Sequence, residues 1–231
     1  MKLAIIPARG GSKRIPHKNI KNFFGKPIIA WSIETAQRCS CFDRIIVSTD
    51  DVEIANVARQ YGVEVPFVRP KELAGDFVGT IPVIRHGIEW FESQGVHFDE
   101  VCCLYATAPF ITADDILEGL DILYSQNSDF TLAITGFTFP IQRAVKIDSS
   151  GYLEMFQPNH FNTRSQDLEQ AYHDTGQFCW GRTNAWKHDR PFFSQKVAPL
   201  ILPTYRVQDI DTPEDWERAE QIFRLISTSL S

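Results

Sequence analysis

The amino-terminal stretch reads Leu3-Ala4-Ile5-Ile6-Pro7-Ala8-Arg9-Gly10-Gly11-Ser12-Lys13-Arg14-Ile15-Pro16-His17-Lys18-Asn19. Its first four residues are apolar and predict a short buried strand. The glycines that follow let backbone N–H groups approach an anion, and the flanking arginine and lysine side chains neutralise its charge. The spacing further along predicts a helix over 28–38. This strand, loop and helix therefore predict a binding site for an anion, and a triphosphate fits both features.

Two common phosphate-binding patterns do not match this loop. The P-loop pattern GxxxxGK[ST] is absent, because Gly25-Lys26 is preceded by Ile20 five places before the glycine and followed by Pro27. The glycines at 10 and 11 are not followed by the spacing that GxGxxG requires. Both a P-loop kinase and a dinucleotide-dependent dehydrogenase are thereby disfavoured. A merely solvated basic loop is disfavoured too, since the loop directly follows a core strand.

Charge is divided unevenly along the 231 residues. Residues 1–33 hold seven of the 23 basic side chains and none of the 29 acidic ones, so this part carries +7 and the remainder −13. The net charge of −6 argues against a general nucleic-acid binder, whereas one basic end suggests a local anion site. With 43% hydrophobic and 23% charged residues, the composition is that of an ordinary globular protein.

The five cysteines predict neither a disulfide framework nor a zinc site. Their number is odd, and Cys102 and Cys103 are adjacent in an apolar run where a strand would point them to opposite faces. No CxxC pairs with a second metal half-site. We expect buried free thiols in a reducing compartment. No signal peptide and no membrane-spanning run is predicted, so we expect a cytoplasmic protein.

Apolar strands alternate with amphipathic helices along most of the chain, a pattern typical of an α/β fold with a mostly parallel sheet and helices on both faces. We expect strands at 3–6, 44–48, 65–68, 101–105, 130–134, 177–180 and 200–202. Helices are expected at 28–38, 51–61, 81–91 and 116–124, and a last one begins at Thr212-Pro213. A single domain covers residues 1–231.

The stretch from about 138 to 170 lacks this alternation. Residues 145–147 and 152–154 flank Asp148-Ser149-Ser150-Gly151, which is a hairpin signal. We therefore expect an inserted β-rich arm that packs on a second subunit and makes the protein a homodimer.

Asp209 and Asp211 form the second chemical feature. In an extended chain both point to one side while Ile210 faces the core, so two hard oxygen ligands stand together, as Mg²⁺ requires. Helix capping is the alternative, and it suits Thr212 and Asp215 better. The adjacent Asp50 and Asp51 are also candidates for metal binding, but Asp51 stands where a helix cap is expected, so we prefer capping there.

The segment from Arg9 to Asn19 resembles the signature of cytidylyltransferases that activate nonulosonic acids, the sialic-acid-type sugars, as CMP esters. The similarity continues through Val47-Ser48-Thr49-Asp50-Asp51, Arg69-Pro70-x-x-Leu73-Ala74 and Asp209-Ile210-Asp211. Three segments of this sequence differ from the sialic acid enzymes and resemble instead the pseudaminic acid branch of the family. They are Tyr105-Ala106-Thr107-Ala108-Pro109, Asn162-Thr163-Arg164-Ser165-Gln166-Asp167 and Tyr172-His173-Asp174-Thr175-Gly176-Gln177-Phe178. The family implies a nucleotide-diphospho-sugar-transferase-like (Rossmann-like) fold.

The resemblance implies transfer of CMP from CTP to the anomeric hydroxyl of pseudaminic acid, a nine-carbon 2-keto sugar acid, with release of pyrophosphate, for surface glycan or flagellin glycosylation. It assigns Arg9, Lys18, Asp209 and Asp211 to catalysis, and the two aspartates to Mg²⁺, which lowers the pKa of the attacking hydroxyl. Whether Asp211 is also a general base is left open. The nucleotide-binding residues that it implies are Ala8, Arg9, Gly10, Gly11, Ser12, Lys13, Lys18, Asn19, Arg69 and Thr80.

The carboxylate of the sugar needs a separate cation. The resemblance implies that Lys146 or Arg164 reaches it, across a dimer interface; a lysine facing water is the alternative for Lys146. Tyr105 and Gln177 are expected to contact the sugar substituents, and Phe192-Phe193 to supply apolar surface. The alternatives are activation of N-acetylneuraminic or legionaminic acid, a non-catalytic nucleotide-binding protein, and an RNA-binding protein, which the −13 remainder disfavours.

Overall fold

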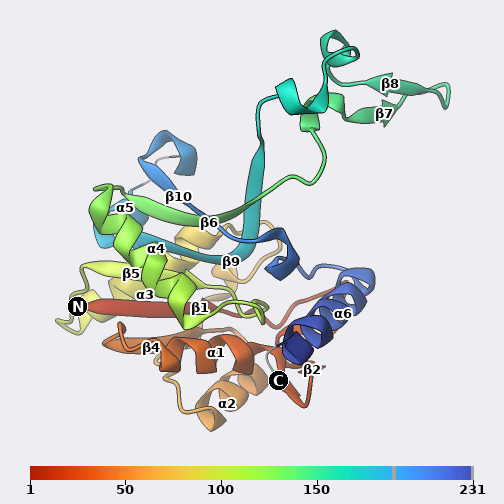
Figure 1. The fold of residues 1–231 in the computed structure, drawn as a ribbon. Coiled ribbons are helices and arrows are strands. Elements are labelled where there is room, and N and C mark those ends of the chain that lie inside the picture. Colours follow the sequence, from red (N-terminus) through yellow and green to blue (C-terminus); the bar gives the residue numbers. More distant parts are fainter. Residues whose placement is uncertain (189–190, 230–231) are drawn as a thin grey trace.

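The computed structural model describes residues 1–188 and 191–229, and its centre is a six-stranded sheet in the order β10-β6-β9-β5-β1-β4 (Figure 1). β1 pairs in parallel with both β4 and β5, and β10 pairs in parallel with β6. β9 alone runs antiparallel to its neighbours β5 and β6. The predicted mixed, mostly parallel sheet is therefore confirmed. Its strands are β1 (Lys2–Pro7), β4 (Arg44–Ser48), β5 (Glu100–Leu104), β6 (Phe130–Gly136), β9 (Tyr172–Arg182) and β10 (Val197–Ile201).

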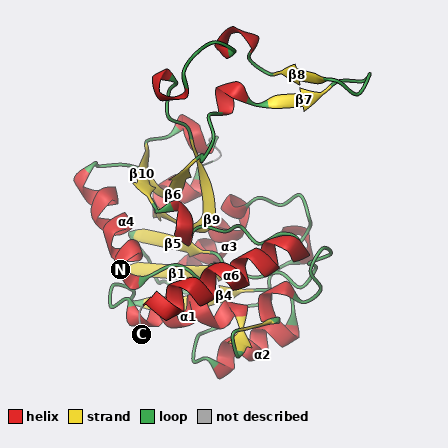
Figure 2. Ribbon diagram, turned by 45° about the vertical axis from the view of Figure 1, so that its right-hand side comes forward, coloured by secondary structure: helices red, strands yellow, loops and turns green. Residues whose placement is uncertain are grey.

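Helices cover both faces of this sheet (Figure 2). One core layer combines apolar residues of α1, α2 and α4 with one face of the strands, and the other combines α3 and α5 with the opposite face. Cys102 lies in the first layer and Cys103 in the second, as the alternation of a strand predicts. The helices are α1 (Ile28–Arg38), α2 (Val52–Gln60), α3 (Thr80–Ser93), α4 (Ala113–Ser125), α5 (Thr183–Lys187) and α6 (Pro213–Ser229).

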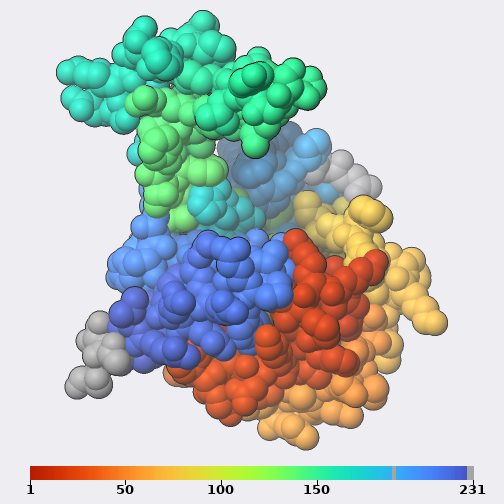
Figure 3. Space-filling model, turned by 90° about the vertical axis from the view of Figure 1, so that its right-hand side faces the viewer, coloured from red at the N-terminus to blue at the C-terminus, as the bar shows by residue number. Residues whose placement is uncertain are grey.

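A third apolar cluster joins the two ends of the chain. Phe23 contacts Trp216 and Phe223 of α6 edge to face, with ring centroids 5.4 and 5.3 Å apart. Ile15 and the fully buried Ile210 belong to the same cluster. Figure 3 shows the blue carboxy-terminal part packed against the red amino-terminal part. This packing brings the segment around Ile210 to the loop that follows β1.

The helix cap expected at Asp51 is confirmed, and a further cap stands at the start of α4. The Asp51 carboxylate accepts hydrogen bonds from the backbone N–H groups of Glu53 and Ile54 at the start of α2. Thr112 and Asp115 form a capping box at the start of α4. Such side-chain caps satisfy N–H groups that the helix itself leaves unpaired. These aspartates therefore have structural tasks.

The expected strand at 65–68 is wrong. Only an isolated bridge between Ile46 and Glu64 extends the sheet there, and Val68 is exposed. Pro66 has no N–H to donate to a neighbouring strand, which explains why pairing stops. Two other strands begin earlier than expected, since β9 starts at Tyr172 and β10 at Val197.

The inserted arm projects away from the α/β body (Figures 1 and 3). Its hairpin is confirmed: β7 (Val145–Ile147) pairs with β8 (Leu153–Met155), and Gly151 in the turn has a φ of 86°. The arm is less β-rich than expected, because three one-turn 3₁₀ helices occupy the rest of it: Ile141–Arg143, Pro158–His160 and Ser165–Asp167. Large apolar side chains of the arm are exposed, including Phe156 and Phe161.

The remaining short elements lie in loops of the body. β2 (Asn22–Phe23) and β3 (Lys26–Pro27) form a small hairpin, and one-turn 3₁₀ helices occupy Lys18–Ile20, Lys71–Leu73, Phe192–Ser194 and Thr204–Arg206. Within the described ranges, no helix has the length and apolar character needed to cross a bilayer.

Replacing Arg206 with alanine is expected to lower the free energy of unfolding by about 3 kcal/mol at neutral pH. Arg206 donates to both carboxylate oxygens of Asp115 at 2.7 and 2.9 Å, and the Asp115 side chain is only 8% exposed. Removing the guanidinium leaves that carboxylate buried without its cation. Urea denaturation of both proteins measures the loss, and Arg218→Ala, which removes an exposed pair with Glu214, serves as the control.

The ion pair of Arg206 and Asp115 also predicts that the free energy of unfolding depends on pH. Although burial opposes the shift, the hydrogen bonds from Arg206 and Thr112 hold the pKa of Asp115 below its usual range. The pair therefore stabilises the fold above the unfolded pKa of about 4 and loses its contribution as the pH falls through the lower folded pKa. The difference between the wild type and Arg206→Ala should shrink in acid, and a constant difference would contradict this account.

Candidate functional site

A cleft of about 210 Å³ opens beside the loop that follows β1. Four cationic side chains surround it, and one carboxylate faces them from the segment before α6. The segment after β5 forms another wall. The lining residues are Pro7, Arg9, Ser12, Lys13, Arg14, Lys18, Asn19, Tyr105, Ala106, Thr107 and Asp211. The cleft is therefore suited to an anionic ligand.

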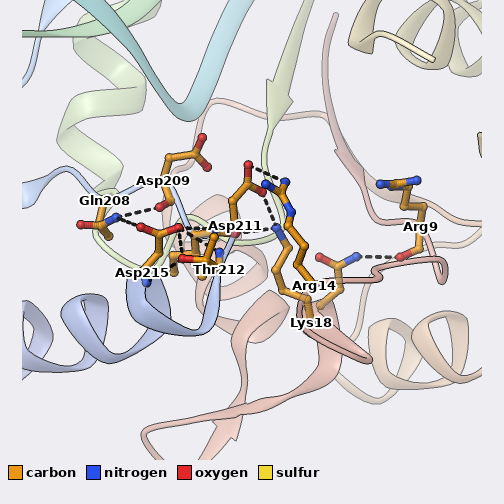
Figure 4. Close-up of polar contacts among 10 residues, drawn as sticks. Arg9, Arg14, Lys18, Gln208, Asp209, Asp211, Thr212 and Asp215 are labelled. Atoms are coloured by element: carbon orange, nitrogen blue, oxygen red, sulfur yellow. Dashed lines mark hydrogen bonds and ion pairs between the residues drawn. The ribbon is translucent and has the colours of Figure 1, made fainter. Parts of the chain in front are cut away.

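Two of the four cations pair with Asp211. Its carboxylate lies 3.2 Å from Lys18 Nζ and 2.8 Å from Arg14 Nη2 (Figure 4). Lys18 also donates to the carbonyl oxygen of Ile210 at 2.5 Å. These contacts join the amino-terminal loop to residues nearly two hundred positions later. The opposite ends of the sequence, one basic and one acidic, thus meet at a single site.

The other two cations, Arg9 and Lys13, pair with Asp76. Arg9 Nη1 donates to one carboxylate oxygen, and Lys13 Nζ lies 2.6 Å from the other. These two hydrogen bonds hold the pKa of Asp76 at about 2. Asp76 belongs to the segment between the 3₁₀ helix Lys71–Leu73 and α3, and it is not among the residues that line the cleft.

Hydrogen bonds within the protein hold the backbone of the loop in place. Gly10 donates its N–H to Asp50 at 3.1 Å, and Ser12 donates to the carbonyl of Gly10 at 3.0 Å. A Cβ atom at Gly10 would lie 2.4 Å from a carboxylate oxygen of Asp51, so only glycine fits there. Gly11 faces open space, and Ala8 is buried with its N–H bonded to Ser48. The predicted backbone contacts to a phosphate remain predictions.

Arg69 is held at the end of β4, whereas Asn19 holds the loop itself. Arg69 is 4% exposed and donates to the hydroxyl of Ser48 at 3.1 Å and to the carbonyl of the same residue. Burial lowers the pKa of Arg69 to about 10. Asn19 donates to the carbonyl of Arg9 at 2.9 Å and also lines the cleft, whereas Arg69 does not.

A second, more apolar pocket of about 460 Å³ adjoins the first. Tyr105 lines both, and its hydroxyl lies 3.0 Å from the hydroxyl of Thr80, the first residue of α3. Phe192 and Phe193 line the apolar pocket, together with Asp174 as its one charged lining residue among those described. The structure therefore brings Tyr105, Thr80 and the two phenylalanines together.

Ile210 is buried as expected. Its two neighbours, Asp209 and Asp211, are shown in Figure 4. Partial burial and the charge of Asp211 raise the pKa of Asp209. Although burial opposes it, the hydrogen bond from Lys18 and the charge of Arg14 lower the pKa of Asp211. In the described part of the chain, no group makes a hydrogen bond or ion pair with the Asp209 carboxylate.

The donor set at this site fits Mg²⁺. A partly buried carboxylate without a partner, beside a second carboxylate, gains from a hard dication that takes oxygen ligands. Within residues 1–188 and 191–229, no group of three or more histidine, cysteine or acidic side chains is arranged around a metal position. The chain therefore offers a pair of ligands, and such a pair commonly shares the ion with substrate phosphates and water.

Three predicted substrate contacts lie elsewhere. Lys146 and Arg164 are on the arm, where they pair with Glu154 at 3.2 Å and with Asp167 at 2.6 Å. Gln177 is 2% exposed and donates to the carbonyl of Arg206 at 2.7 Å, while its own side-chain oxygen is buried without a partner. None of these three residues lines either pocket described above.

Sequence reasoning missed three residues of this site. Arg14 stands in the basic loop and is visible there, but nothing local distinguishes it from a solvated arginine. Asp76 and Asp50 reach the loop from positions 40 to 67 residues away from their partners. No spacing rule links residues so distant, so only the fold reveals these contacts.

The sequence is similar to known proteins over almost its whole length. A family model described as "Cytidylyltransferase" matches residues 3–224. The chain is 44% identical over 223 residues to the pseudaminic acid cytidylyltransferase of Campylobacter jejuni, covering 96% of each chain. It is 33% identical to the CMP-N,N'-diacetyllegionaminic acid synthase of Legionella pneumophila, covering 99% of this chain and 98% of that one.

Among solved structures, CMP:2-keto-3-deoxy-manno-octonic acid synthetase complexed with CTP superposes with a TM-score of 0.73 at 15% identity. The match covers 97% of this chain and 98% of that one, and at such low identity it shows the fold alone. It confirms the fold that the resemblance implied. Since the family model and the relatives cover almost the whole sequence, the chain belongs to the cytidylyltransferase family.

Proposed function

We propose that this protein transfers CMP from CTP to the anomeric hydroxyl of pseudaminic acid and releases pyrophosphate. The supporting observation is the cleft, where four cations of one loop face Asp211; its neighbour Asp209 does not itself line the cleft. The 44% identity to a pseudaminic acid cytidylyltransferase over nearly the full length supports the choice of sugar.

In this proposal the loop after β1 holds the triphosphate. Arg9, Lys13 and Lys18 neutralise its charge, and Ser12 contributes from the wall of the cleft. Asn19 fixes the loop carbonyl at Arg9, so it positions that arginine as well as facing the nucleotide. Transfer of this kind depends mainly on positioning and on charge neutralisation. The chain supplies both through one continuous segment.

Asp209 and Asp211 would hold the Mg²⁺ ion. When bound, such an ion neutralises phosphate charge and lowers the pKa of a coordinated hydroxyl. Lys18 and Arg14 orient the Asp211 carboxylate, whereas Asp209 has its oxygens available. Both carboxylates would therefore contribute to the metal site: Asp211 in an orientation fixed by Lys18 and Arg14, and Asp209 with oxygens that no other described group occupies.

The sugar acid is proposed to enter beside Tyr105, between the two pockets. The apolar pocket offers Phe192 and Phe193 to the less polar substituents, and the hydroxyl pair of Thr80 and Tyr105 lies at its border. Gln177 is buried and donates to the carbonyl of Arg206, so we propose that it stabilises the segment at Arg206 and does not contact the sugar. The sugar carboxylate still requires a cation.

We propose that a second subunit supplies this cation from its arm. Lys146 and Arg164 are on an arm that extends away from the body and exposes apolar side chains such as Phe156 and Phe161 (Figure 1). Arginine is the better choice, because its planar fork matches a carboxylate with two hydrogen bonds. The protein would then act as a homodimer; its cytoplasmic location remains a prediction.

A substrate panel tests the proposed reaction. Purified protein with CTP and Mg²⁺ should release pyrophosphate with pseudaminic acid, and much more slowly with N-acetylneuraminic or N,N'-diacetyllegionaminic acid. Replacing CTP with ATP or UTP is the control for base selection. Release with either of the other acids but none with pseudaminic acid would show that the assigned sugar is wrong, and no release with any of them would refute the reaction.

A further inference from the structure

Asp76 is a carboxylate that meets the cationic loop from outside the cleft. It lies in the segment 74–79, which separates the 3₁₀ helix Lys71–Leu73 from α3. Its two oxygens contact Arg9 and Lys13, the cations that the proposed function gives to the triphosphate. In the described part of the chain, neither cation has another acidic partner. Asp76 therefore occupies the groups that phosphate oxygens need.

The two pairs are exposed enough to be exchanged. The side chains of Arg9 and Asp76 are 37% and 35% exposed, and that of Lys13 is 81% exposed. Ion pairs of this kind contribute little stability in water, since solvent screens them and side-chain entropy opposes them. A triphosphate carries more charge than one carboxylate. It can therefore displace Asp76 at little cost.

The segment that carries Asp76 has few other attachments. Gly75 and Gly79 flank it, and Phe77 at its tip is fully exposed. Its one internal backbone hydrogen bond runs from Val78 to Gly75 at 3.3 Å. Ala74 and Val78 are only partly buried, and neither belongs to the apolar core clusters of the described residues. The ion pairs of Asp76 therefore connect this segment to the loop.

We infer that Asp76 is a positioning residue: it holds Arg9 and Lys13 together as an internal counter-ion, and the triphosphate displaces it on binding. The inference rests on the proposed function. Asp211 differs from Asp76, because it lines the cleft and belongs to the proposed metal pair. Without the Asp76 carboxylate, Arg9 and Lys13 carry unneutralised charge in the free protein. Binding of the triphosphate should therefore become more favourable.

Calorimetry of CTP binding in the absence of sugar acid tests this. Asp76→Asn should bind CTP about three- to tenfold more tightly than the wild type, from the loss of two competing surface pairs. The difference should shrink in about 0.5 M salt, which screens both the pairs and the phosphates. Asp76→Glu should restore wild-type binding, and kcat of Asp76→Asn should change less than KM for CTP.

Glu64→Gln is the matched control, because it removes an exposed carboxylate that pairs with Arg44 at 3.0 Å away from the cleft. Unchanged or weaker CTP binding by Asp76→Asn would overturn the inference. Inorganic tripolyphosphate separates this failure from that of the proposed function. If the wild type binds tripolyphosphate but not CTP, the proposed cytidylyl transfer is wrong, and the displacement of Asp76 is then tested with tripolyphosphate. If the wild type binds neither ligand, the proposed function and the inference about Asp76 are both wrong.

Discussion

Asp209→Asn is expected to lower kcat/KM for CMP transfer on the order of a hundredfold or more while leaving the fold intact. The substitution keeps the shape of the side chain but removes the charge that a dication needs. Asp209 makes no ion pair in the described part of the chain, so its replacement breaks no protein contact of that kind. Asp211→Asn is less informative, because it also releases Lys18 and Arg14.

Two measurements check this expectation. Steady-state pyrophosphate release gives the loss of activity, and titration with Mn²⁺ in the presence of CTP reports metal binding directly. Glu214→Gln, on the first turn of α6, is the control and should behave as the wild type; among the described residues, Glu214 pairs with Arg218 alone. Full activity of Asp209→Asn with unchanged metal binding would show that the metal assignment is wrong.

The Asp209 prediction was possible from sequence because it depends on a local rule. Alternation in an extended segment places Asp209 and Asp211 on one side and Ile210 in the core, and the structure buries Ile210 completely. The strands and helices of the first half follow the same logic. Apolar periodicity and capping residues such as Asp51 and Thr112 are encoded within a few positions.

Contacts between distant segments were not predictable in this way. The direction of β9 depends on its neighbours β5 and β6, and nothing within residues 172–182 specifies an antiparallel strand. The false strand at 65–68 has the apolar pattern of a strand but contains Pro66. The pairing of Asp76 with Arg9 and Lys13 depends on a loop packing that has no sequence signature.

Subunit mixing is expected to restore about a quarter of wild-type activity to two inactive variants. One variant is Asp209→Asn, which disables the body. The other is Lys146→Ala/Arg164→Ala, which disables the arm. If each site combines one body with the arm of the partner, a mixed dimer contains one site with both parts intact. Random pairing of equal amounts makes half of the dimers mixed, and each of these has one working site of two.

The arm substitutions should not unfold the protein, because the ion pairs that the described residues form with Lys146 and Arg164 lie within the arm, and both side chains are about half to two-thirds exposed. Activity is measured after the two variants are dissociated and reassembled together, and each variant treated alone is the control. A site completed by its own arm predicts no recovery, since every chain then carries a defect. Full activity of the arm variant alone would show that Lys146 and Arg164 of the arm are not needed in the site. Recovery near one quarter is the outcome that only an arm acting across the dimer produces.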